Sequence, residues 1–105
     1  MSLKIFHIKH LQDYFKALPE IKYVWLFGSY AKGLNDKYSD IDLLVEYDMS
    51  IKLSIKEHKD SIEKITKIKT QIVPLNGLDV SFLNKITPHA ILIYTHSPTL
   101  PLRML

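Results

Sequence analysis

The sequence predicts an α+β (α/β) fold, a small mixed β-sheet with helices packed mainly on one side. Apolar residues at three- and four-residue spacing predict helices at residues 7–18 and within 51–69. Compact apolar runs predict strands at 21–27 and 41–46. These elements alternate along the chain, and a loop of moderate length joins the two strands, which favours a mixed sheet covered by helices.

The composition is that of a packed globule. The chain has 105 residues, 47% of them hydrophobic, which suffices for one domain over residues 1–105. It has no cysteine, which excludes disulfides, cysteine-ligated zinc and a cysteine nucleophile. Its apolar runs are far shorter than the ~20 residues of a membrane span. The first residues lack the apolar core of a signal peptide, so we expect a cytoplasmic protein with no membrane partner.

The net charge is +3, and lysines concentrate between Lys52 and Lys69. A basic balance permits a nucleic-acid partner, but lysines along a helix are more often its solvated face, so nucleic acid is not an expected partner.

The two long helices have recognisable ends. The first stops at Pro19, and its apolar stripe comprises Ile8, Leu11, Phe15 and Leu18. In the second, Ser54 and Glu57 match a capping box. His58 lies on the apolar stripe of that helix, where a partly buried packing role is favoured over a ligand role.

Between the two strands, residues 30–32 are predicted to form one helical turn that Gly33 closes. Residues 34–39 then form a polar loop, in which Asn35 and Asp36 are typical turn residues.

The C-terminal part is predicted to contain a connection at 71–76 and a third strand at 78–83, with Asp79 and Ser81 on one face. Thr87-Pro88 favours a helix over 88–95, although the same residues are rich in β-formers and also suit a buried strand. We prefer the helix, followed by an extended segment at 98–102.

Two acids open the second strand. Side chains alternate along a strand, so Asp40 and Asp42 share a face while Ile41 points into the core. Adjacent carboxylates repel each other, and a fold tolerates them mainly where a cation lies between them. Mg²⁺ binds in this way, through one or two carboxylates together with substrate phosphates.

Gly28-Ser29 ends the first strand. Glycine lets the backbone approach a phosphate closely, and Ser29 offers a hydroxyl and an N–H group at the start of a turn. A phosphate-binding turn one hairpin away from a metal-binding pair indicates a site for phosphoryl or nucleotidyl transfer. The alternative is a polar hairpin loop, which does not explain two acids on one strand face.

The segment GSYAKGLNDKYSDIDLLV resembles the minimal nucleotidyltransferases of the DNA polymerase β-like superfamily, in which Gly-Ser precedes Asp-x-Asp by ten residues. The order of the surrounding elements extends the resemblance over nearly the whole chain. It implies the nucleotidyltransferase fold and transfer of a nucleoside monophosphate from ATP or another triphosphate, with pyrophosphate released.

The resemblance also implies roles for the acids. Asp40 and Asp42 would be catalytic residues that bind Mg²⁺, and a second ion would activate the attacking hydroxyl. Asp79 resembles the third carboxylate of the superfamily, on a strand beside the Asp-x-Asp strand, as a metal ligand or proton acceptor. An ordinary aspartate at the start of a strand is the alternative for Asp79.

The nucleotide would be bound by Gly28 and Ser29, which would hold the β- or γ-phosphate. Lys32 would add a point charge where many relatives carry arginine, and a free surface lysine is the alternative.

Minimal members of the superfamily resemble antitoxins that add AMP to a tyrosine of a small all-helical HEPN-type toxin. The resemblance therefore implies a HEPN-like partner. Three alternatives stay open: an inactive module that binds nucleotide and partner, an enzyme acting on a small molecule, and a nucleic-acid binder that uses the 52–69 helix.

Overall fold

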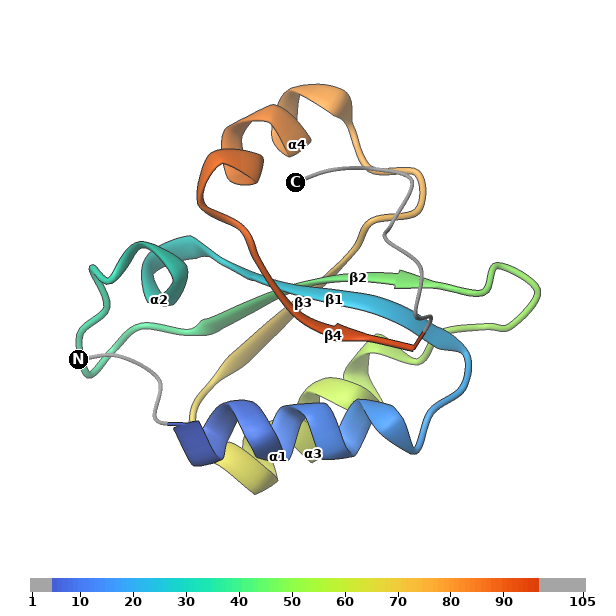
Figure 1. Cartoon of the computed structure of the whole chain (residues 1–105), viewed down its shortest axis with the longest axis horizontal. Helices are drawn as coiled ribbons and strands as arrows, with labels where there is room; N and C mark the ends of the chain where they lie inside the picture. The colour runs from blue at the N-terminus through green and yellow to red at the C-terminus, as the bar shows by residue number, and fades with distance from the viewer. Residues whose placement is uncertain (1–4, 97–105) are drawn as a thin grey trace.

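The computed structural model describes residues 5–96, which form one four-stranded sheet flanked by helices (Figure 1). The elements are, in order, α1 (Ile5–Lys16), β1 (Ile21–Phe27), α2 (Gly28–Lys32), β2 (Ile41–Tyr47), α3 (Ile55–Thr66), β3 (Thr70–Pro74), α4 (Val80–Ile86), the 3₁₀ helix η1 (Thr87–His89) and β4 (Ile91–Thr95). The segment predicted at 98–102 lies outside the described residues.

The strand order is β3-β2-β1-β4, so the two strands predicted first form the centre of the sheet. β1 pairs antiparallel with both β2 and β4, and β2 pairs parallel with β3. The sheet is therefore mixed, and the predicted fold class is confirmed. Within residues 5–96, no helix combines the length and apolar content needed to cross a membrane.

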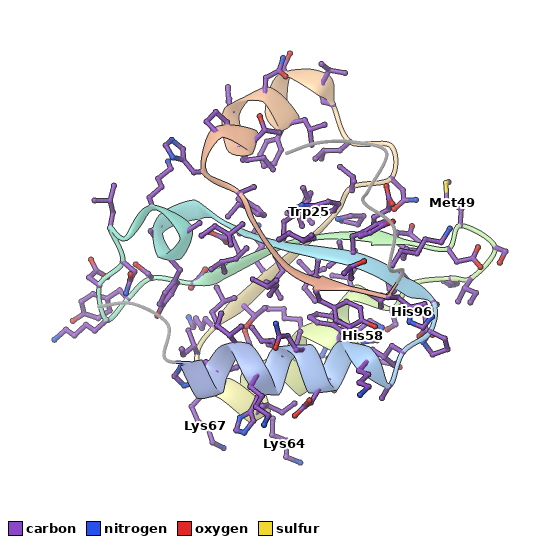
Figure 2. All side chains as sticks on the ribbon, viewed as in Figure 1. Trp25, Met49, His58, Lys64, Lys67 and His96 are labelled. Atoms are coloured by element: carbon purple, nitrogen blue, oxygen red, sulfur yellow. The ribbon has the colours of Figure 1, made fainter. Side chains whose placement is uncertain are left out.

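Each face of the sheet has its own apolar core. The α1/α3 face contains Leu11, Phe15, Val24, Leu26, Ile41, Leu43, Val45, Ile62 and Ile72. The opposite face contains Tyr23, Trp25, Phe27, Leu44 and Leu75, with Leu83 and Ile86 of α4 packed against them. Figure 2 shows Trp25 on the α4 side of the sheet and His58 on the other side. Alternate residues of β2 thus face different cores, as expected for a central strand.

His58 joins the two helices of the larger layer. Its Nδ1 lies 2.6 Å from the hydroxyl of Tyr14, and the two rings meet edge to face. The residue is partly buried, which confirms the packing role predicted for it. Ser54 precedes α3 as predicted, but its side chain makes no capping hydrogen bond.

Two predictions for the C-terminal part were wrong. The third strand is not 78–83 but β3, which overlaps the stretch 71–76 assigned to a connection, and 80–86 form α4. Residues 88–95 are not a helix, because only η1 is helical and β4 follows it. The β-rich run pairs with the outer edge of β1, with Leu92 opposite Trp25. This pairing satisfies N–H and C=O groups of β1 that would stay unpaired if the run were helical.

Candidate active site

The Gly28-Ser29 turn leads from β1 into α2 and lies directly against the Asp42 carboxylate. Gly28 has a φ of +75°, which favours glycine, and a Cβ atom built on it would overlap Oδ2 of Asp42. Glycine is therefore required here both by conformation and by space. The missing side chain lets the Asp42 carboxylate lie directly against the backbone of the turn.

Asp42 is the second residue of β2, and its side chain is partly buried on the α4 face. Its partners in the sheet are Phe27 on β1 and Gln71 on β3. Burial, and secondly the charge of Asp40, raise the pKa of Asp42 to about 6. Asp40 is exposed just before the strand. The two predicted acids are therefore close enough to repel each other.

The raised pKa of Asp42 predicts that Asp42→Asn stabilises the metal-free protein above about pH 6. Between pH 4 and 6 the folded chain keeps a proton that the unfolded chain has released, so stability falls as the pH rises. The full difference is at most about 3 kcal/mol, and partial exposure lowers the expected gain at pH 7 to about 1–2 kcal/mol. Urea unfolding of both proteins at pH 4 and pH 7 tests this; an equal difference at the two pH values would contradict it.

The loop between α2 and β2 is held by its own polar groups, as predicted. Gly33 ends α2 in the left-handed conformation, and the N–H of Leu34 donates to the Ser29 carbonyl at 2.9 Å. The Asp36 carboxylate accepts from the N–H of Tyr38 at 2.8 Å. This loop fixes the path by which the chain returns to the two acids.

Two clefts adjoin Asp40, and sequence reasoning missed both. One, of about 390 Å³, is lined by Tyr30, Lys37, Tyr38, Ser39, Asp40, Lys67, Ile68 and Lys69. The other, of about 490 Å³, is lined by Asp40, Ile55, Lys59, Glu63, Lys69, Thr70, Gln71 and Ile72. The sequence signal that could have indicated these clefts is the concentration of lysines in and after α3, which was interpreted as the solvated face of a helix. Figure 2 shows Lys67 and Lys64 extending away from the sheet at the α3 end.

The charges around these clefts are mixed. Burial raises the pKa of the Tyr30 phenol, and the nearby Asp36 and Asp40 raise it further. Lys32 is exposed in the last turn of α2 and lies outside both cleft linings.

The three-carboxylate prediction was wrong for Asp79. This residue is not in a strand; it caps α4, and its carboxylate accepts from the N–H of Ser81 at 3.0 Å. It follows the carboxyl end of β3, whereas Asp42 lies at the amino end of β2, which runs parallel. Among residues 5–96, no group of three His, Cys, Asp or Glu side chains could hold a metal ion.

The donor set that remains still fits Mg²⁺. Asp40 and Asp42 supply hard oxygen atoms, and the missing side chain at Gly28 lets the Asp42 carboxylate lie directly against the turn. Mg²⁺ needs no complete protein cage, because it binds through one or two carboxylates and completes its shell with water and phosphate oxygens.

Comparisons with known proteins identify the family that the chain resembles. The profile of the family "Polymerase beta, Nucleotidyltransferase" matches residues 9–99. Two relatives from Methanocaldococcus jannaschii are each named "Putative protein adenylyltransferase". The first is 37% identical, and the match covers 79% of this chain and 72% of the relative. The second is 36% identical, and the match covers 69% of this chain and 80% of the relative.

Solved structures share the fold. One is a crystal structure of a toxin–antitoxin with AMP-PNP. The match covers 89% of this chain and 74% of the other chain, with a TM-score of 0.71 and 20% sequence identity. A second structure is that of a tri-AMPylated Shewanella oneidensis HEPN toxin in complex with MNT antitoxin. The match covers 86% of this chain and 71% of the other chain, with a TM-score of 0.66 and 15% sequence identity. Because the profile match spans most of the sequence and the two archaeal relatives are close, this chain belongs to the polymerase beta nucleotidyltransferase family and is a nucleotidyltransferase.

Proposed function

We propose that this nucleotidyltransferase transfers AMP from ATP, with Mg²⁺, to a hydroxyl group of a small all-helical HEPN-type protein. The observation that carries the proposal is the contact of the side-chain-free Gly28 with the Asp42 carboxylate, since it brings a phosphate-binding turn and a metal-binding pair together. The relatives named as adenylyltransferases and the structural likeness to an MNT antitoxin with its HEPN toxin support the choice of reaction and acceptor.

The residues divide the work between holding the triphosphate and holding the cation. Gly28 and Ser29 bind the outer phosphates through backbone N–H groups and the serine hydroxyl. Asp40 and Asp42 hold Mg²⁺, which when bound neutralises phosphate charge and supports departure of pyrophosphate. Lys32, in the last turn of α2, is available as an additional point charge.

The chemical step exchanges a phosphoanhydride bond for a phosphoester bond. The acceptor oxygen forms a bond to the α-phosphorus, and the bond from that phosphorus to the bridging oxygen of the β-phosphate breaks. Pyrophosphate takes the electron pair of the broken bond, and the hydroxyl proton passes to water. Asp79 is not assigned the role of proton acceptor, because it caps α4 at the other end of the parallel strands.

Transfer of the α-phosphate is expected, and transfer of the γ-phosphate is not. A turn that holds the outer phosphates beside the acids leaves the α-phosphorus facing the acceptor, whereas a kinase places its metals across the β- and γ-phosphates. The purified protein is mixed with Mg²⁺, a HEPN-type protein of its own organism, and ATP labelled at either position. Label from the α-position should appear on the HEPN protein and be lost in Asp40→Ala and Asp42→Ala.

Transfer of γ-label would overturn the nucleotidyl-transfer mechanism. A second candidate, an inactive module that binds nucleotide and partner, is favoured by Gln71 beside Asp42 and by Asp79, which caps α4 instead of joining the acid pair. It predicts that ATP and Mg²⁺ raise the melting temperature while neither label is transferred.

A further inference from the structure

Gln71 is the polar neighbour of Asp42 in the sheet. The parallel pairing of β2 with β3 sets Asp42 beside Gln71 and Leu44 beside Val73. Residues paired in this way project from the same face, and directly adjacent side chains are roughly 5 Å apart. Leu44 and Val73 belong to the α4-side core, which assigns Asp42 and Gln71 to that face as well. The other neighbour of Asp42 is the aromatic ring of Phe27.

Gln71 also reaches the surroundings of Asp40. It is exposed, and it lines the larger cleft together with Asp40 and Lys69. Gln71 is therefore the strand neighbour of Asp42 and shares a cleft lining with Asp40. Its amide oxygen is a neutral ligand for a hard cation, and at neutral pH it neither carries charge nor accepts a proton.

We propose that Gln71 is the third side chain of the cation site, and that its neutrality limits the site to one divalent cation per bound nucleotide. This rests on the proposed function. A second cation within about 4 Å of the first needs further negative charge to offset mutual repulsion. Among residues 5–96 no third acid joins the pair, and Gln71 occupies the position beside Asp42 from which a carboxylate would complete it.

The count of bound cations tests the proposal without measuring turnover. Mn²⁺ is titrated into equimolar protein and α,β-methylene ATP, and free Mn²⁺ is followed by electron paramagnetic resonance against a nucleotide-only titration. One Mn²⁺ per complex is expected for the natural sequence and two for Gln71→Asp. For Gln71→Ala we expect one, bound roughly tenfold more weakly, in the range seen when a supporting group is removed from a metal site.

A control variant separates local from overall charge. Asn84→Asp adds the same charge on the exposed surface of α4 and should leave the Mn²⁺ count at one. Gln71→Asp should also lower the melting temperature of the metal-free protein by a few degrees at pH 7, because it adds a third negative charge beside two, whereas Asn84→Asp should not.

Two Mn²⁺ ions in the natural complex, or one in Gln71→Asp, would overturn the proposal. Either result leaves the proposed function intact as long as Asp42→Asn reduces Mn²⁺ binding. If Asp42→Asn binds Mn²⁺ as the natural protein does, the acid pair is not the cation site, and the proposed function fails together with the role of Gln71.

Discussion

With Asp42 replaced by asparagine, AMP transfer should fall by about 10³-fold or more while the metal-free protein becomes more stable. The loss is large because the acid pair acts as one unit with the cation, and removing one member of such a unit removes most of its effect. The gain in stability follows from relief of burial and of repulsion by Asp40. Activity and stability are thus expected to change in opposite directions, which simple misfolding cannot produce.

The measurement pairs transfer rates with melting curves. Mg²⁺ and ATP together should raise the melting temperature of the natural protein by mass action, and the Mg²⁺-dependent part should vanish in Asp42→Asn. Asp13→Asn is the matched control, because Asp13 is an exposed residue of α1 on the opposite face of the sheet. An unchanged Mg²⁺-dependent shift in Asp42→Asn would show that Asp42 does not bind the cation.

Gly28→Ala should reduce transfer by about 10²-fold or more, although it adds only one methyl group. The added Cβ meets the Asp42 carboxylate, so either the carboxylate or the turn must move, and a displacement of about 1 Å at a reacting centre costs about 10²-fold. The left-handed backbone adds a cost of about 1 kcal/mol in stability.

Gly33→Ala separates these two effects. Gly33 has a φ of +73°, nearly that of Gly28, but no atom lies within 4 Å of a Cβ built there. Both variants should lose similar stability from backbone strain, and only Gly28→Ala should lose the Mg²⁺-dependent melting shift. Equal loss of transfer in the two variants would mean that strain, and not the contact with Asp42, determines the requirement for glycine.

The acid pair and the glycine turn could be predicted because their signals are local. Alternation along one strand relates Asp40 to Asp42, and a hydrophobic run that ends in Gly-Ser marks the turn. The contact of Gly28 with Asp42 follows from the pairing of Phe27 with Asp42. Neighbouring strands with an identifiable loop between them leave little freedom in this part of the site.

The neighbour of Asp42 on the other side could not be predicted in the same way. β3 is five residues long, ends in Pro74 and lies at the edge of the sheet, where a missing N–H group is tolerated. A short run ending in proline is equally typical of a connection, so Gln71 was not recognised. Asp79 was instead predicted to lie beside the acid pair. An aspartate two residues before a serine is compatible with one face of a strand and also with the helix cap that Asp79 forms.

For β4, the choice between helix and strand depends on a segment that is distant in the sequence. Thr87-Pro88 does begin a helical turn, but η1 has only three residues. The β-rich run that follows η1 pairs with the edge of β1 that β2 leaves free. No pattern within residues 87–95 indicates that this edge is available.

The placement of the site within one hairpin also affects how the chain reaches its native state. Gly28, Ser29, Asp40 and Asp42 come together as soon as β1 pairs with β2, and closing a short loop costs less chain entropy than closing a long one. Gln71 joins only when β3 docks, after the chain has passed through α3. Pairing of β1 with β2 also sets the Asp42 carboxylate against Gly28, so the cost of partly burying this charge falls on an early, local step of folding. Mg²⁺ and nucleotide present during refolding would accelerate that step, in addition to holding the finished protein together.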